Sequence, residues 1–269
     1  MNKPKETFAS TLECFQWKYD LHKVFDDFLT MSICAVTRNP VTGLSHYEDL
    51  YLETIKPYKN DELRFQFPKM FALLVAEIEA LVGTCNDVLG TYYEAHFLKK
   101  GTQQFFTPWN ICMFMAKSSF ETVEHPEEQE PIRILEPACG SGRMLLAASQ
   151  VSGKHHHFYG VDIDATCVKM TALNLFLNGL FHSEVACCNF LMPDDFRFSY
   201  RLSFLPLGIF RIEEKEQSPL WHSIRLQGNG KQESRKGKEP LQVQADISNL
   251  KLPSDEGNQE GYNQQLQLF

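Results

Sequence analysis

Two glycines and a carboxylate are the residues of this chain best suited to binding a nucleotide-like ligand. Gly140 and Gly142 follow an apolar run, Ile132 to Leu135, whose branched residues are typical of a short buried strand. Glycine lets the backbone turn tightly and approach a ligand, and a helix predicted from Met144 to Ser149 would point its free N–H groups back at this loop. A second apolar run ends in Asp162, whose carboxylate can accept hydrogen bonds from ribose hydroxyls. The spacing predicts a nucleotide-type pocket at the carboxyl ends of parallel strands.

The glycine loop alone does not identify the ligand. Leu145 stands where the dinucleotide fingerprint G-x-G-x-x-G needs its third glycine, and a lone G-x-G also occurs in strand-to-helix turns that bind nothing. Asp164, two residues past the predicted ribose acceptor, fits the N-cap of the next helix. A third run, Glu184 to Cys188, predicts a strand that ends at Asn189.

Four segments resemble, in their order, the N6-adenine DNA methyltransferases, especially the modification subunits of type I restriction systems. Asp87-Val88-Leu89-Gly90-Thr91-Tyr92-Tyr93-Glu94 is similar to the D-x-L-G-x-x-Y-E segment that precedes motif X in those subunits, and Gln104-Phe105-Phe106-Thr107-Pro108 is similar to motif X itself. Glu136-Pro137-Ala138-Cys139-Gly140-Ser141-Gly142 resembles motif I, and Phe158-Tyr159-Gly160-Val161-Asp162 resembles motif II. The resemblance covers residues 60 to 215, and motifs I and II carry most of its specificity.

The resemblance implies S-adenosylmethionine, rather than NAD, as the ligand. It also implies an α/β fold, a Rossmann-like S-adenosylmethionine-dependent methyltransferase core preceded by a helical N-terminal region, although the strands that close a full methyltransferase sheet are not visible in the sequence. The cofactor-binding residues that it implies lie in motif X, motif I and the ends of the second and third strands: Gln104, Phe106, Thr107, Pro108, Glu136, Ala138, Cys139, Gly140, Ser141, Gly142, Asp162, Ile163 and Asn189.

Three regions are expected along the chain. Apolar residues at three- and four-residue intervals predict one or two helices over residues 7–36 and another from Pro68 to Gly83, within a helical region spanning residues 1–100. The methyltransferase core is expected over 101–215. The remaining segment, 216–269, is rich in Gln, Gly, Ser, Lys and Glu and is expected to be mostly disordered.

The catalytic segment of the family is missing from this sequence. In the family, Asn-Pro-Pro-Phe or Asn-Pro-Pro-Tyr ends the fourth strand, where the Asn side chain and a proline carbonyl accept hydrogens from the target N6 amine. The expected position reads Phe204-Leu205-Pro206-Leu207-Gly208, which has one proline but neither the amide nor the aromatic residue that follows the prolines. No catalytic residue is therefore assigned.

Three functions fit this combination. The first is a DNA adenine-N6 methyltransferase of the type I modification kind, with a partner specificity subunit supplying DNA recognition. The second is a non-catalytic, DNA-associated relative that keeps the cofactor pocket, and the third is a truncated fold whose pocket serves another small acceptor. A net charge of −8 argues against tight autonomous binding to a polyanion, which favours DNA contact through a partner or a local patch.

Composition limits the cellular setting. The most apolar stretch, Phe71 to Val82, is interrupted by two glutamates and is too short to span a membrane, and no secretory signal is evident, so a cytoplasmic protein is expected. The eight cysteines have no C-x-x-C spacing, and Cys14, Cys34 and Cys112 in apolar runs are expected to be reduced and buried. Three consecutive histidines, 155–157, are expected in a solvated loop without a metal.

The C-terminal sequence resembles a second known recognition element. Gln265-Leu266-Gln267-Leu268-Phe269 looks like the Q-L-x-L-F peptide with which bacterial polymerases and repair proteins bind the replicative sliding clamp. Gln265 suits hydrogen bonding to backbone, and Leu266, Leu268 and Phe269 suit apolar pockets. The alternative is a Gln-rich tail that ends in apolar residues by coincidence.

Overall fold

The computed structural model describes most of the chain. Its described residues are 6–38, 42–43, 45–81, 83–98, 104–120, 130–192, 194–225, 245–246 and 265–268. The helices are α1 (Phe8–Leu12), α2 (Leu21–Val36), α3 (Glu48–Ile55), α4 (Gln66–Ala80), α5 (Val88–His96), α6 (Trp109–Phe120), α7 (Arg143–Ser152) and α8 (Ala165–Leu177). The strands are β1 (Arg133–Glu136), β2 (His157–Asp162), β3 (Ser183–Cys187), β4 (Phe198–Phe204), β5 (Leu207–Ile212), β6 (Ala245–Asp246) and β7 (Gln265–Leu268).

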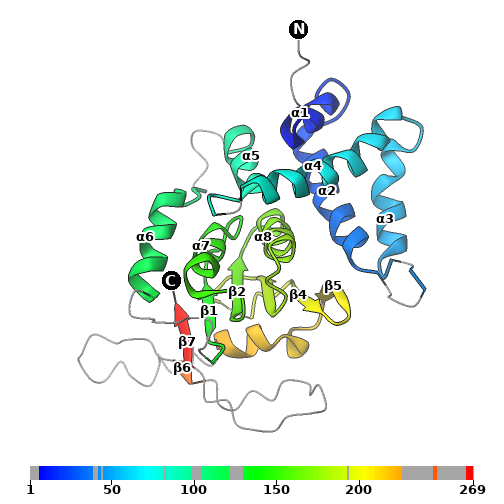
Figure 1. The fold of residues 1–269 in the computed structure, drawn as a ribbon. Coiled ribbons are helices and arrows are strands. Elements are labelled where there is room, and N and C mark those ends of the chain that lie inside the picture. The colour runs from blue at the N-terminus through cyan, green and yellow to red at the C-terminus, as the bar shows by residue number, and fades with distance from the viewer. Residues whose placement is uncertain are drawn as a thin grey trace.

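The strands form one mixed sheet in the order β5-β4-β3-β2-β1-β7-β6 (Figure 1). The three strands predicted from the sequence, β1, β2 and β3, are adjacent and parallel, and α7 and α8 make the crossovers between them. The carboxyl ends of these three strands therefore lie along the same edge of the sheet, where the glycine loop follows β1 and Asp162 ends β2. The predicted α/β, Rossmann-like arrangement is confirmed for this part of the chain.

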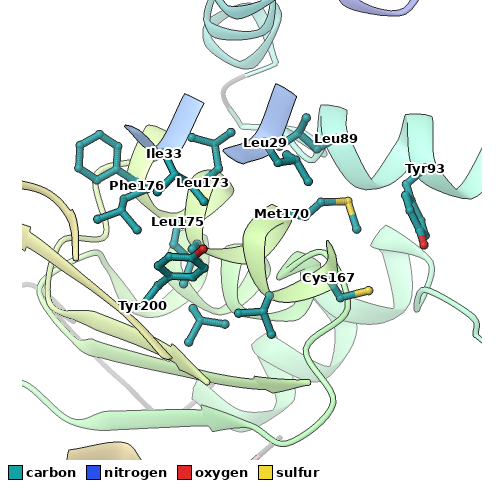
Figure 2. Packing of buried hydrophobic residues seen from close by; sticks show 14 of the residues in the cluster. Leu29, Ile33, Leu89, Tyr93, Cys167, Met170, Leu173, Leu175, Phe176 and Tyr200 are labelled. Atoms are coloured by element: carbon teal, nitrogen blue, oxygen red, sulfur yellow. The ribbon is translucent and has the colours of Figure 1, made fainter. Parts of the chain in front are cut away.

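The N-terminal helices pack directly on the core. Figure 2 shows Leu29 and Ile33 of α2 and Leu89 of α5 close to Met170 and Leu173 of α8, and all five are buried in one hydrophobic cluster. That cluster continues through α8 to the first face of the sheet. The helical region predicted over residues 1–100 and the core thus bury their apolar surfaces against each other. The helix α3, which the sequence patterns did not predict, presents no fully buried residue.

A helix over residues 219–225, drawn in orange in Figure 1, covers the second face of the sheet. Its Leu220 and Ile224 pack against Leu135, Val161 and Ala186, one residue from each of the three parallel strands. The packed part of the chain consequently extends past the predicted boundary at 215, because an apolar sheet face needs a cover. Most of the remaining tail lies outside the described residues.

The segment 204–208 does not occupy the position that the sequence analysis expected. β4 runs antiparallel to β3, with Ser183 opposite Leu202, and its tight turn into β5 lies beside the amino end of β3. The turn at Leu205 and Pro206 is therefore at the opposite edge of the sheet from the glycine loop. The expected alignment with the catalytic segment of the family was wrong, since it assumed a fourth parallel strand.

Two further expectations need correction. Cys14 is exposed, because it lies on a short 3-10 turn where only its neighbour Phe15 points into the core. The histidine segment is not a solvated loop: His156 is buried and His157 opens β2. Burial and the neighbouring His155 lower the pKa of His156 to about 4, so its imidazole is neutral near pH 7. Within the described residues no helix is long and apolar enough to cross a bilayer.

The helix over 219–225 should be part of the cooperative fold. We expect Trp221→Ala to lower the free energy of unfolding by about 3–5 kcal/mol, because the indole is only 2% exposed and its removal leaves a cavity. Urea unfolding followed by circular dichroism measures this. The matched control is Glu216→Ala in the exposed turn before the helix, which should change stability by less than about 0.5 kcal/mol. Equal stability of the two variants would place residues 216–225 outside the folded core.

Candidate functional site

The loop between β1 and α7 depends on two glycines in left-handed backbone conformations. Gly140 has φ 55° and Gly142 has φ 85°, values that other residues adopt at a cost. A Cβ on Gly140 would lie 2.9 Å from the ring of Phe106, and a Cβ on Gly142 would lie 3.0 Å from the methyl group of Thr171. Gly142 is also the N-cap of α7, so the free N–H groups of this helix face the loop.

Asp162 at the end of β2 holds this loop in place. One of its carboxylate oxygens accepts a hydrogen bond from the backbone N–H of Gly140 at 2.8 Å, and the other accepts from the N–H of Asp164 at 2.9 Å. Burial raises the pKa of Asp162, although these backbone hydrogen bonds oppose the shift. Asp164 caps α8 as predicted, by accepting from the N–H groups of Thr166 and Cys167. Both oxygens of Asp162 keep lone pairs for a ligand.

A second carboxylate, that of Asp87, binds the glycine loop on the side that faces the protein interior. It is fully buried and accepts four hydrogen bonds: from the Ser141 hydroxyl at 2.6 Å, the Arg143 Nε at 2.9 Å, the Asn174 amide at 2.8 Å and the Gly90 N–H at 2.8 Å. Burial opposes the charge of Arg143, but Asp87 more than compensates and the pKa of the guanidinium is raised. One side chain thus joins α5, the glycine loop and α8.

The segment that resembles motif X covers the glycine loop. Gln104 donates from its amide to Asp164 at 2.9 Å, and the Phe106 ring stacks on Tyr93 with a centroid separation of 5.9 Å. The Pro108 carbonyl accepts the N–H groups of Ile111 and Cys112 and so begins α6. This arrangement brings the residues of motif X over those of motif I.

A small cavity of about 50 Å³ lies between motif X and motif I. This is below the roughly 300–1,000 Å³ of most ligand sites, so in this conformation it admits only one end of a larger ligand. Two larger cavities, of about 450 and 670 Å³, lie away from the glycine loop. We favour the smaller one as the candidate site because the backbone donors and carboxylates converge there. Its lining is Phe105, Phe106, Thr107, Glu136, Ala138, Cys139, Gly140, Ser141, Arg143 and Met144.

Glu136 is the acidic residue in the lining of this cavity. Burial raises the pKa of the Glu136 carboxyl to about 7, the Ala138 N–H lowers it, and the charge of Asp162 raises it further. Among the described residues, the Ala138 N–H at 3.2 Å is the one hydrogen-bond donor to this side chain. A half-buried carboxylate without a cationic partner suits a cationic ligand group. The residues present therefore fit the ammonium and sulfonium groups of S-adenosylmethionine.

Most of the predicted cofactor residues lie together. Seven of them line the cavity: Phe106, Thr107, Glu136, Ala138, Cys139, Gly140 and Ser141. Asp162 and Gln104 act on the surrounding loops, Gly142 and Pro108 shape the starts of α7 and α6, and Ile163 is 62% exposed beside Asp162. Asn189 follows β3, and its side chain accepts from the Leu191 N–H. The sequence analysis did not assign the lining residues Phe105, Arg143 and Met144 to the site, although all three adjoin predicted residues.

Comparison with known proteins agrees with this geometry. The family model of the N-6 DNA methylases matches residues 84–199, which run from the start of the Asp87 segment into β4. Over these residues the chain is similar to the N-6 DNA methylases. The predicted family and, with it, S-adenosylmethionine as its cofactor are confirmed.

The individual relatives of this chain are distant. The methylase subunit of the type I restriction enzyme MpnII from Mycoplasma pneumoniae is 22% identical over 183 residues, which are 63% of this chain and 32% of that protein. The type II methyltransferase M.MamI of Microbacterium ammoniaphilum is 24% identical over 183 residues, covering 57% of this chain and 50% of that one. The chain thus spans half or less of the length of these curated relatives.

Among solved structures, the methyltransferase subunit of a type I restriction-modification system from Streptococcus thermophilus is similar to this chain. It is 14% identical, with a TM-score of 0.34, over 64% of this chain and 55% of that one.

The Asp87 cluster should be the most sensitive polar site of the N-6 DNA methylase region. We expect Asp87→Ala to cost about 3–5 kcal/mol of unfolding free energy, because the buried Arg143 guanidinium loses its shorter ion pair and keeps only the half-exposed Glu94 at 3.3 Å. The double variant Asp87→Ala, Arg143→Met should recover part of the loss, as measured by urea denaturation. Asp49→Ala, an exposed acid in the first turn of α3, is the control. Additive losses in the double variant would contradict this coupling.

Glu136 should make stability depend on pH. Its pKa is raised to about 7 in the folded protein from an ordinary value of 4.5, so the native state retains a proton that the unfolded chain releases. The protonated Glu136 carboxyl contributes at most about 3 kcal/mol of stability. This contribution is lost as the pH rises from about 4.5 to about 7. Glu136→Gln removes the titration, so the variant should gain stability relative to the wild type between pH 5 and pH 8.

His156 and His157, whose pKa values are lowered to about 4, act in the opposite direction between pH 4 and 6.5. They are present in both proteins and cancel in the difference. Glu213→Gln, at an exposed acid, should show no such pH dependence. A constant difference between Glu136→Gln and wild type at pH 5 and 8 would contradict the assignment.

Proposed function

We propose that this chain is the S-adenosylmethionine-binding part of a DNA adenine-N6 methyltransferase of the type I modification kind, acting in the cytoplasm with a partner subunit that recognises DNA. The observation that carries the proposal is the glycine loop, held by Asp162 on one side and Asp87 on the other, facing the half-buried carboxylate of Glu136, which has no cationic partner among the described residues. The net charge of −8 supports a partner for DNA recognition.

The residues of the site have distinct roles in this proposal. Glu136 would attract the cationic end of the cofactor, and Asp162 would accept hydrogen bonds from ribose hydroxyls with the lone pairs that its two loop contacts leave free. Phe105 and Phe106 would exclude water from the methionine end, and Asn189 would accept from the adenine amine. When bound, S-adenosylmethionine supplies an electrophilic methyl group on its sulfonium.

A non-catalytic relative is the alternative, and one observation favours it. The sequence contains no Asn-Pro-Pro, and the segment 204–208 lies at the amino edge of the sheet, far from the glycine loop. The segment 204–208 therefore offers no amide acceptor for a target amine beside the cofactor site. In this alternative the protein binds S-adenosylmethionine and DNA-associated partners without methyl transfer.

One experiment separates these functions: calorimetric titration with S-adenosylmethionine together with a tritiated-methyl transfer assay on unmethylated DNA. We expect saturable binding that Asp162→Asn weakens about tenfold to a hundredfold, because an uncharged amide cannot satisfy both loop amides and the ribose. Isolated protein should show methyl transfer reduced by at least about 10²–10³, since an electrostatic acceptor is missing.

The matched control is Asp195→Asn, an exposed acid near the same edge of the sheet, which should bind like the wild type. Wild-type affinity in Asp162→Asn, with an unchanged circular dichroism spectrum, would contradict the cofactor site. Robust adenine methylation by the isolated protein would eliminate the non-catalytic alternative.

We also propose that the C-terminal peptide binds a sliding clamp. In the structure Gln265–Leu268 is already paired with β1, with Leu268 opposite Leu135, so clamp binding would require this strand to leave the sheet. A fluorescent peptide of the last fifteen residues should therefore bind purified clamp more tightly than the full chain does. Changing Leu268 and Phe269 to Ala should abolish peptide binding. No saturable binding at high micromolar clamp, or equal binding by the changed peptide, would contradict the proposal.

A further inference from the structure

The largest of the three cavities named here lies at the edge of the sheet opposite the glycine loop. It has a volume of about 670 Å³, which is within the range of ligand sites. Its walls come from the start of β2, the start of β3, the β4–β5 turn and the first residue of the helix over 219–225. We call it the basal cavity. It shares no lining residue with the candidate cofactor site.

The basal cavity is lined by more cationic than anionic groups. Lys154 and Arg201 line it together with His155, His157 and His182, whereas the one described acid in the lining is Glu184. One oxygen of the Glu184 carboxylate accepts from the hydroxyls of Ser199 at 2.7 Å and Ser218 at 2.6 Å, and the other lies 4.0 Å from the Arg201 guanidinium and offsets part of its charge. The Lys154 ammonium donates to the neutral Asn178 carbonyl at 2.7 Å, so its charge remains uncompensated.

Unpaired donors surround the histidines of this cavity. Arg133 on β1 lies opposite His157 in the parallel register, and its Nη1 atom is buried without a hydrogen-bond partner among the described residues. The His155 Nε2 atom is likewise buried without a described partner. The rings of His157 and His182 are 5.6 Å apart. Burial is the main cause that lowers the pKa of His157 to about 4, and the neighbouring His182 and Arg133 lower it further.

Aromatic rings stand at the rim of the same cavity. Phe181 and Phe204 lie 5.3 Å apart, and Phe204 at the end of β4 is 56% exposed although it is an aromatic residue. Such a ring pair offers a surface on which a planar base can stack. A cationic floor and an aromatic rim are together the two features that a phosphorylated nucleoside requires.

We propose that the basal cavity binds a phosphorylated nucleoside, either free or within a nucleic-acid strand. The phosphate is held by Lys154 and the imidazole N–H groups, and the base stacks on Phe181 and Phe204. This site is independent of the cofactor site, so the protein has two nucleotide-type sites at opposite edges of one sheet.

Protons and phosphate should bind to this cavity cooperatively. A phosphate next to His157 favours the protonated imidazole, so affinity should rise as pH falls from 7.5 to 5.5. The titratable and charged groups that face His157 come from β1, the α7–β2 loop, the α8–β3 loop and strands β2 to β4: Arg133, Lys154, His155, Tyr159, His182, Glu184 and Arg201. Only the histidines among them titrate in this range in their ordinary state.

The test is calorimetric titration of the full chain with thymidine 5′-monophosphate, thymidine, inorganic phosphate and a short oligothymidylate. A pyrimidine probe avoids competition with the adenosine part of S-adenosylmethionine. We expect the monophosphate to bind at least tenfold more tightly than thymidine or phosphate at pH 6, and His182→Ala and Phe204→Ala each to weaken it fivefold or more. His157→Gln should remove most of the pH dependence.

The side chains of His182 and Phe204 are exposed, so these two variants should fold. The control Phe65→Ala removes an aromatic residue that is 62% exposed on the N-terminal helices, and Asp162→Asn alters only the cofactor site; neither should affect the monophosphate. Tighter binding of the oligonucleotide than of the monophosphate assigns the ligand to a nucleic-acid strand, and the reverse assigns it to a free nucleotide. No saturable binding of either at millimolar concentration, equal binding of thymidine, or loss of binding only in Asp162→Asn would overturn the proposal.

Discussion

The structure depends most on one buried charge, the carboxylate of Asp87. Carboxylates are rarely buried unless every lone pair has a partner, and this one accepts from a hydroxyl, a guanidinium, a side-chain amide and a backbone N–H. These partners belong to the glycine loop, α7, α8 and α5. Because an unpaired buried charge is costly, the four groups must be assembled together. The loop that approaches the ligand is therefore fixed from the protein interior.

This arrangement explains why the N-terminal helices cannot be treated as a separate accessory region. Asp87 caps α5 through the Gly90 N–H while it binds the glycine loop, and Tyr93 of α5 supports the Phe106 ring above that loop. A Cβ on Gly90 would collide with both Asp87 and Ser141, so the helix must approach closely at this point. The site therefore depends both on helices that precede the sheet in the sequence and on the loop between β1 and α7.

Sequence reasoning predicted the parts of the site that depend on short segments. The turn at Gly140, the acceptor at Asp162 and the N-cap at Asp164 all follow from local backbone requirements. It could not predict the three distant partners of Asp87, which are Ser141, Arg143 and Asn174 and lie 54 to 87 positions away in the chain, because no local pattern encodes such a contact. The direction of β4 was missed for a related reason. This strand pairs with the free edge of β3, and an apolar run in a sequence does not indicate whether a strand will be parallel or antiparallel to its neighbour.

The position of β1 has a consequence for how the molecule assembles. On one side Arg133 pairs with His157 of β2, a nearby residue, while on the other side it pairs with Leu266 of β7, which is separated from it by almost half of the chain. Contacts between residues so far apart in the sequence form late, because closing a large loop costs entropy before the strands can pair. During folding, β1 is consequently an unpaired edge that can associate with strands of other molecules. The yield of refolding should then be governed by protein concentration more than by the stability of the finished sheet.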